Sequence, residues 1–434
     1  MSMSVITQLV GGTFPDPNGS DGATLSVPVK SVIIADSLDG NEAEAVKQLD
    51  FEFPLAVVSD PLTHQVLGSQ VERALESLGT IIKVRLDDQP HADMETADRL
   101  IIETAQTGAL IAVGSGTIND LCKLAAARQN KPCAVFATAP SMNGYTSVNA
   151  AITDRGLKKS IPAVSPDGVF MDLRVLADAP VRMIRSGLGD SVCRPTAQAD
   201  WLLAHLLFSN NYTETPFQFL ANEEQGLFAE PEALVSGDLE AMGRLARTLV
   251  LSGLGMTVCG GSYPASQGEH LISHYIEMMH PPEWHNVFHG EQIAVTTLVM
   301  ARLQEQLLSD SSPVINRSRK SKADILKHFG SGIGDACWEE YKLKQLDRDR
   351  ADKLNMQLAE SWSEICEKIK TITISPETIA SVLKRAGAPL THSDIGLGKE
   401  FFLNAICHAH EIRNRYTFLD LANDTGKLNA SSLI

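Results

Sequence analysis

The chain has 434 residues, more than one ordinary hydrophobic core holds, which predicts about two or three domains. Its formal net charge of −16 repels phosphate backbones and anionic lipid, so neither nucleic acid nor a membrane surface is expected as a partner. Its seven cysteines, an odd number without a CxxC pair, indicate neither a disulfide framework nor a zinc knuckle. With no signal peptide and no apolar run of ~18 residues, we expect a cytoplasmic protein.

The first part of the chain alternates between short apolar runs and helical patterns. Residues up to about Val27 are expected to be a loose leader or short edge strands, and Val71–Leu78 and Glu95–Thr107 are predicted helices. Strands that alternate with helices form a parallel sheet with helices on its faces, so we predict an α/β domain over residues 1–178. The predicted strands are Val32–Ile34, Leu55–Val58, Ile81–Val84, Leu110–Val113, Ala134–Ala137 and Val169–Met171.

After about Pro180 the pattern changes to longer helical segments with few strand-like runs. We therefore predict an all-α domain over residues 179–434, with a surface loop at Ser309–Ser321. The predicted helices are Met183–Leu207, Leu239–Leu254, Gly268–Met279, Gln292–Leu308, Ala351–Lys370 and Phe401–Arg415.

A glycine loop, Gly114-Ser115-Gly116-Thr117, lies between a predicted strand and a predicted helix. Glycines let the backbone approach a ligand closely, and the N-terminus of the following helix attracts phosphate. The full Gly-x-Gly-x-x-Gly pattern of dinucleotide-binding loops is absent, so a tight strand–helix turn stays open as the alternative.

Asp60 ends the predicted strand that begins at Leu55. A carboxylate there can accept hydrogen bonds from an adenosine ribose and repel a 2′-phosphate, which favours NAD over NADP. The alternative is that Asp60 caps the N-terminus of a helix.

A metal site is predicted from three segments. Asp190 follows a glycine pair, His270 and His274 lie four residues apart on one helical face, and His289 stands at a predicted helix start. A carboxylate and two imidazoles suit zinc or another divalent first-row metal and leave a position open for substrate. Such a metal polarises a carbonyl or acidifies an alcohol. On spacing alone, histidines of ordinary helix faces remain the alternative.

Several motifs in the same order resemble the sn-glycerol-1-phosphate dehydrogenase family, within the iron-containing alcohol dehydrogenase and dehydroquinate synthase-like superfamily. The likeness runs from about Leu55 to Leu421. The motifs are Gly114–Asp120, Thr138–Ser147, Gly187–Asp190, Pro264–His274, His289–Glu291 and Ile412–Leu421.

The resemblance implies an N-terminal Rossmann-like domain that binds NAD or NADP, a helical domain that binds the metal, and a substrate cleft between them. It assigns the metal to Asp190, His270 and His289, and it places His274 near the substrate. The cofactor residues that it implies are Asp60, Gly114, Ser115, Gly116, Thr117, Asp120, Thr138 and Ser141.

Two departures from the superfamily pattern are informative. Iron-type alcohol dehydrogenases carry a further histidine four residues after the aspartate ligand, where this chain has Arg194. That difference favours a zinc- or nickel-using branch with three ligands, although iron stays open. Related enzymes usually have aspartate where this chain has Asn143, and they hold it near the substrate hydroxyls. The loss of that charge fits a more anionic substrate, a shifted specificity or neutral drift.

The resemblance implies the reversible reduction of dihydroxyacetone phosphate, a phosphorylated triose, to sn-glycerol 1-phosphate by NAD(P)H. His274 and Asn143 are the candidate catalytic residues. Asn143, Lys158 and Lys159 are the candidates for substrate binding, the lysines through the phosphate, unless they form a solvated basic turn. A closed homo-oligomer is the expectation for a soluble enzyme.

Three other functions stay open at this stage. One is a polyol or glycerol dehydrogenase of the same superfamily that acts on an uncharged alcohol. Another is a dehydroquinate synthase-like cyclase, a lyase, although that branch usually has glutamate where this chain has Asp190. The third is a non-catalytic binding protein, against which the intact ligand trio argues.

Overall fold

The computed structural model describes residues 5–15, 24–154, 157–281, 284 and 287–434. They form two compact units, each built from two stretches of the chain. The first unit takes 1–191 and 214–261, and the second takes 192–213 and 262–434. Residues 179–191 and 214–261, which lie within the predicted helical domain, belong in the structure to the unit that contains the sheet.

Six parallel strands form the main sheet of the first unit, in the order β3-β10-β7-β6-β4-β5. Each predicted apolar run lies in one of them, which confirms the predicted α/β architecture. From β4 the chain adds β5 on one side, and it then adds β6, β7 and β10 in turn on the other side. The direction of strand order therefore reverses between the neighbours β4 and β6. The strands are β3 (Ser31–Ala35), β4 (Leu55–Ser59), β5 (Ile81–Arg85), β6 (Ala109–Gly114), β7 (Cys133–Ala137) and β10 (Gly168–Asp172).

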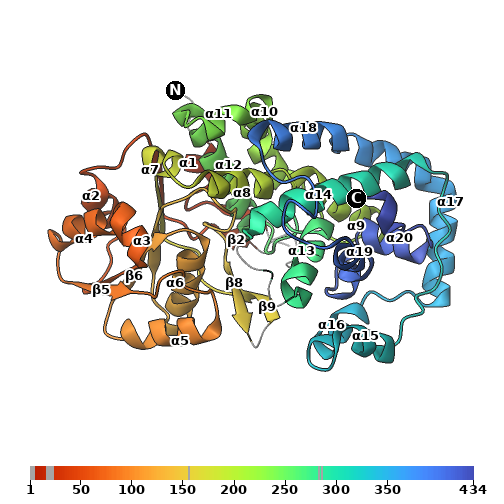
Figure 1. The fold of residues 1–434 in the computed structure, drawn as a ribbon, viewed down its shortest axis with the longest axis horizontal. Helices are drawn as coiled ribbons and strands as arrows, with labels where there is room; N and C mark the ends of the chain where they lie inside the picture. The colour runs from red at the N-terminus through yellow and green to blue at the C-terminus, as the bar shows by residue number, and fades with distance from the viewer. Residues whose placement is uncertain (1–4, 16–23, 155–156, 282–283, 285–286) are drawn as a thin grey trace. The chain divides into compact units, whose positions relative to one another are not determined.

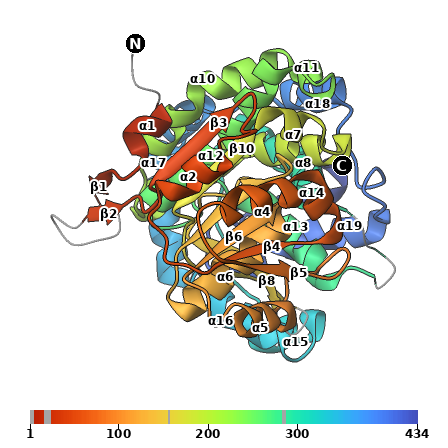
Figure 2. The same ribbon diagram turned by 90° about the vertical axis from the view of Figure 1, so that its left-hand side faces the viewer.

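Helices cover both faces of this sheet. Every second residue of the central strands packs in one apolar cluster with α2 (Glu42–Lys47) and α4 (Ser69–Glu76). These two helices lie beside each other in Figures 1 and 2. The other face is covered by α6 (Gly116–Gln129), against which α5 (Met94–Glu103) packs. The carboxyl ends of β4 and β6 thus meet at the edge from which α6 begins.

The first unit also contains two antiparallel hairpins. The pair β8 (Asn149–Asp154) and β9 (Leu157–Pro162) was not predicted, because only Ala150 and Ile152 of β8 are buried and the apolar alternation is short. The pair β1 (Thr13–Pro15) and β2 (Thr24–Ser26) agrees with the expected short edge strands. The remaining helices of this unit are α1 (Val5–Leu9), α3 (Pro61–Thr63), η1 (His64–Gly68), α7 (Leu173–Ala177), α8 (Val181–Ser191), α10 (Thr215–Ala229), α11 (Pro231–Val235) and α12 (Leu239–Val258).

The second unit is helical, and no strand follows Asp172 in the part of the chain that the structure describes. One large apolar cluster forms its core. Figure 1 shows α17 as its longest ribbon, in light blue, with α15 and α16 packed against each other. The helices are α9 (Arg194–Phe208), α13 (Gly268–Met279), α14 (His289–Ser309), α15 (Lys322–Phe329), α16 (Ile333–Tyr341), α17 (Arg348–Lys370), α18 (Pro376–Ala386), α19 (Lys399–His408), η2 (Ala409–Glu411), α20 (Phe418–Asp424) and η3 (Ala430–Ser432).

The prediction of one continuous helix over Met183–Leu207 was wrong. The chain breaks it into α8 and α9, because Pro195 in the first turn of α9 has no N–H to donate and its ring clashes with a preceding turn. The predicted surface loop does lie between α14 and α15. In the described ranges, every helix is too short or too polar to span a bilayer.

Candidate functional site

The glycine loop stands at the point where the strand order switches. Gly114 ends β6, and Ser115 is the N-cap of α6. A Cβ added at Gly114 would lie 2.5 Å from Cδ1 of Ile118, so glycine is required for this tight turn. The turn aims the first N–H groups of α6, and the positive end of its dipole, at the sheet edge. In open α/β sheets this is where a phosphate group binds.

Asp60 follows β4, the strand next to β6. Its Oδ1 accepts the backbone N–H of Thr63 at 2.7 Å, and the two residues form a capping box at the start of α3. The N-cap role that the sequence left open is therefore present. This hydrogen bond uses Oδ1, and the Asp60 side chain is half-buried.

The segment after β7 runs beside the glycine loop. The backbone N–H of Thr138 donates to the carbonyl oxygen of Gly114 at 3.1 Å. The carbonyl oxygen of Ser141 accepts the hydroxyl of Ser186 at 3.0 Å, which ties the same segment to α8. The side chains of Thr138 and Ser141 are both buried. The structure thus brings Thr138 to the glycine loop.

Asp120 has a different neighbourhood from the glycines that precede it. Its Oδ2 accepts the backbone N–H of Ala151 at 3.0 Å, and its Oδ1 lies 3.4 Å from Nζ of Lys123. These contacts give Asp120 a structural role in holding β8 against α6.

Lys123 was missed by the sequence analysis. Its side chain is fully buried, and Nζ donates to the carbonyl oxygen of Gly144 and the hydroxyl of Ser147, each at 3.0 Å, and to the carbonyl oxygen of Asn149. Burial lowers the pKa of Lys123, and the carboxylate of Asp120 opposes that shift. Lys123 therefore clamps the segment that carries Asn143.

Asn143 contacts the predicted aspartate ligand through its backbone. Its N–H donates to Oδ2 of Asp190 at 2.8 Å, and Asp190 is 1% exposed near the end of α8. One turn earlier, a Cβ at Gly187 would lie 1.7 Å from the carbonyl oxygen of Pro140. Only glycine lets α8 approach this segment so closely, which explains why residue 187, three positions before Asp190, is glycine.

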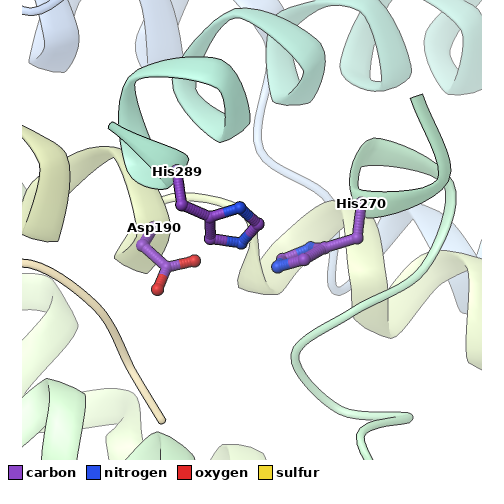
Figure 3. A group of neighbouring side chains, drawn as sticks. All are labelled: Asp190, His270 and His289. Atoms are coloured by element: carbon purple, nitrogen blue, oxygen red, sulfur yellow. The ribbon is translucent and has the colours of Figure 1, made fainter. Parts of the chain in front are cut away.

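Asp190, His270 and His289 form one group. A carboxylate oxygen and one nitrogen of each imidazole all lie within 4.8 Å of one another. Figure 3 shows the three side chains pointing toward one another from α8, α13 and α14. Asp190 and His270 are buried and His289 is half-buried. One buried carboxylate with two imidazoles is a donor set that fits zinc and other divalent first-row metals.

His274 completes a cluster of three imidazoles. Its ring centroid lies 6.0 Å from that of His270 and 6.2 Å from that of His289. The ring stacks roughly parallel to His289, with 24° between the planes. The structure thus places His274 beside both histidines, one helical turn after His270.

Glu269 was also missed. It precedes His270 at the start of α13, is fully buried, and forms with Cys193 and His270 a second group whose ligand atoms lie within 4.8 Å of one another. No spacing rule singles out a glutamate next to a histidine, so the sequence carried no signal for it.

The predicted phosphate-binding lysines lie on β9. Nζ of Lys159 pairs with Oδ2 of Asp154 at 2.6 Å on the exposed hairpin. The backbone of Lys158 pairs with Thr153, and its side chain lies outside the described residues. Arg194, where iron-type relatives have histidine, donates to Oε1 of Gln198 at 2.7 Å.

Comparison with known proteins places the chain among alcohol dehydrogenases. Residues 33–180 match the sequence profile of a family described as iron-containing alcohol dehydrogenase. Over 274 residues the chain is 32% identical to the glycerol-1-phosphate dehydrogenase (NAD(P)+) of Pyrococcus furiosus, covering 63% of this chain and 78% of that protein. The Bacillus subtilis protein of the same name is 27% identical over 412 residues, covering 93% of this chain and 94% of that one.

Solved structures share the fold. The crystal structure of a probable glycerol dehydrogenase from Sinorhizobium meliloti 1021 superposes with a TM-score of 0.62 at 16% identity, covering 93% of this chain and 97% of that chain. The parallel sheet followed by a mostly helical region is therefore an architecture that this chain has in common with that structure.

Proposed function

The chain belongs to the glycerol-1-phosphate dehydrogenase family of the iron-containing alcohol dehydrogenase superfamily, and from that premise we propose that it reversibly reduces dihydroxyacetone phosphate to sn-glycerol 1-phosphate. It is an NAD(P)-linked oxidoreductase of the alcohol dehydrogenase type. The observation that carries the proposal is the grouping of Asp190, His270 and His289 with His274 beside them.

Asp190, His270 and His289 would hold one divalent metal, for which zinc fits the donor set best and nickel and iron are the alternatives. Such an ion, when bound, polarises the substrate carbonyl and stabilises the negative charge that develops on its oxygen. The backbone N–H of Asn143 holds one oxygen of Asp190, which limits the rotation of that carboxylate.

The substrate would be oriented by the segment that Lys123 clamps. The amide of Asn143 is suited to hydrogen bonds with the substrate hydroxyls. His274, whose ring lies beside that of His270, would hold and deliver the proton that the reduced product needs. Lys158 and Lys159 remain the candidates for the substrate phosphate.

The dinucleotide would bind at the switch point of the sheet. Its pyrophosphate would lie on the backbone of Gly114, Ser115, Gly116 and Thr117, with Thr138 and Ser141 lining the site. Because Oδ1 of Asp60 caps α3, Oδ2 would meet the ribose, which favours NADH over NADPH. We expect a higher kcat/KM for NADH in the wild type, and Asp60→Gly to narrow that difference.

The deciding experiment supplies the purified protein with Zn²⁺ or Ni²⁺, NADH and dihydroxyacetone phosphate. We expect NADH oxidation and a product that is the sn-1 stereoisomer of glycerol phosphate. Reaction with dihydroxyacetone or glycerol instead of the phosphorylated pair would refute the proposed substrate and leave the dehydrogenase chemistry intact.

A polyol or glycerol dehydrogenase is the second candidate, since the ammonium group of Lys159 is already paired with Asp154. Lys159→Ala tests whether Lys159 holds the substrate phosphate. If Lys159 holds the phosphate, the KM for dihydroxyacetone phosphate rises while the KM for NADH stays constant. An unchanged KM for both would favour an uncharged substrate or another phosphate site.

Two further expectations accompany the function. We propose a homo-oligomer, which sedimentation of the purified protein tests. We also propose a reducing, cytoplasmic compartment, because within the described ranges none of the cysteines is paired in a disulfide.

A further inference from the structure

We infer that Glu269 is a positioning residue that holds His270 in the tautomer and orientation that bind the metal, an inference that rests on the metal site proposed above. Glu269 is 0% exposed at the second position of α13. Its Oε1 lies 2.9 Å from Nδ1 of His270, within hydrogen-bond distance. Glu269 and His270 both belong to the second compact unit.

The surroundings of Glu269 hold its carboxylate in place. Oε1 also accepts the backbone N–H of Gln267 at 2.7 Å, and Oε2 lies 3.4 Å from the hydroxyl of Thr196. A carboxylate taken out of water is costly unless donors surround it. The N–H of Gln267 is the close donor, and the hydroxyl of Thr196 shares its proton between Glu269 and the carbonyl oxygen of Cys193, which lies 2.8 Å away. Glu269 is therefore fixed on the side of His270 that carries Nδ1.

The hydrogen bond determines the tautomer of His270. A carboxylate only accepts hydrogen bonds, so Nδ1 carries the proton and Nε2 keeps its lone pair. An imidazole binds a metal through such a lone pair, and a carboxylate on the opposite nitrogen makes it more basic. Glu269 thus prepares His270 for coordination through Nε2.

Glu277 lies farther from the other proposed ligand histidine, His289, than Glu269 lies from His270. Nδ1 of His289 lies 3.7 Å from Oε1 of Glu277, beyond hydrogen-bond distance. His270 is also buried, whereas the side chain of His289 is 33% exposed. We therefore expect the support from Glu269 to matter more for metal affinity than any support from Glu277.

Cys193 provides the competing interpretation. Its Sγ lies 3.7 Å from the carbonyl oxygen of Ala265, yet it groups with Glu269 and His270 closely enough to hold an ion. If Cys193 and Glu269 were ligands themselves, Glu269 would contribute by coordination and not by orienting His270. Loss of the Cys193 thiol would weaken metal binding if Cys193 and Glu269 were ligands, and would leave it unchanged if Glu269 only orients His270.

The test measures Zn²⁺ affinity directly, by competition with a chelator, in the wild type, Glu269→Gln and Glu269→Ala. Gln keeps an acceptor toward Nδ1 and loses the charge, so we expect about tenfold weaker binding. Ala loses both, and we expect up to about 100-fold weaker binding. Co²⁺ substitution should give a changed visible spectrum in both variants. The Gln variant keeps the test informative if the Ala variant does not fold.

Asp200→Asn is the matched control. Asp200 is also buried and accepts the N–H of Gly268 at the same helix start, at 2.9 Å, and that of Phe418 at 2.9 Å. Among the described residues it makes no hydrogen bond to His270. We expect Asp200→Asn to lower the stability of the metal-free protein and to leave the Zn²⁺ affinity unchanged.

Several outcomes would overturn the inference. If the wild type and Glu269→Gln bound Zn²⁺ with equal affinity, the positioning role of Glu269 would be refuted, and the proposed metal site would be unaffected. If Glu269→Gln and Asp200→Asn lost equal Zn²⁺ affinity, the loss would come from a disturbed start of α13 and not from the contact with His270. A comparable loss in Cys193→Ser, with a thiolate charge-transfer band for Co²⁺ in the wild type, would make Cys193 a ligand. A wild type that binds no divalent metal would refute the proposed function itself.

Discussion

At the scale of single residues, buried charges mark the candidate site. Lys123, Asp190 and Glu269 are each almost fully buried, and each holds a backbone N–H or carbonyl group of a segment that carries a proposed functional residue. Such groups are costly to bury, so they persist where they hold a particular backbone geometry. We therefore expect their replacement to affect both stability and the site.

Lys123→Met tests this expectation in the Asn143 segment. The variant keeps the apolar stem but leaves the carbonyl oxygens of Gly144 and Asn149 to share the single hydroxyl proton of Ser147, so we expect a loss of about 2–4 kcal/mol in unfolding free energy. Denaturant titration measures it. Lys131→Met is the control: its ammonium also donates to carbonyl oxygens but is half-exposed, so water replaces it and the loss stays below about 1 kcal/mol. Equal losses would contradict the role of burial.

At the scale of elements, α20 joins acidic groups to the core of the second unit. Asp420 pairs with Nζ of Lys344 at 2.7 Å, and Asp424 accepts the hydroxyl of Tyr416 at 3.3 Å. Burial, and secondarily the charge of Asp420, raises the pKa of Asp424 to about 7. The folded protein thus holds a proton on Asp424 that the unfolded chain, with its ordinary pKa of 3.8, releases.

The sign of the pH dependence follows from this shift. The stabilisation is fully present below the unfolded pKa of 3.8 and is lost as pH rises through the folded value of about 7. Asp424→Asn stays neutral, so we expect it to unfold at a higher temperature than the wild type at about pH 8, and the gap to shrink at about pH 5. Asp352→Asn, an exposed change on α17, should show no such trend. A gap that does not depend on pH would contradict the assignment.

At the scale of the whole molecule, the proposed metal links folding to ligand binding. Its ligands come from three helices, α8, α13 and α14. A metal that binds only the folded chain adds about 2.7 kcal/mol of stability when its concentration is 100 times its Kd. We expect a chelator to lower the unfolding temperature and Zn²⁺ to restore it. In His270→Ala and His289→Ala the unfolding temperature should not respond to Zn²⁺, and a full response in both would refute the ligand assignment.

Much of the fold was predictable because its signals are local. The strands of the main sheet are buried on both faces and therefore read as short apolar runs, and helical periodicity marked α13 and α14. The break between α8 and α9 was missed although Pro195 was visible, because apolar periodicity continues across it. The hairpin β8–β9 was missed because its buried side is short.

The sequence by itself determined the α/β sheet, the helical region after it and, through motifs in a matching order, the candidates Asp190, His270 and His289. Only the tertiary structure decided what surrounds them. It showed that one oxygen of Asp60 caps α3, that Lys159 pairs with Asp154, and that Glu269 faces His270. The physical reason is that helices and strands can be recognised from the apolar periodicity of a few neighbouring residues. The partner of a buried polar group, such as the carbonyl of Gly144 for Lys123, instead depends on how distant segments pack.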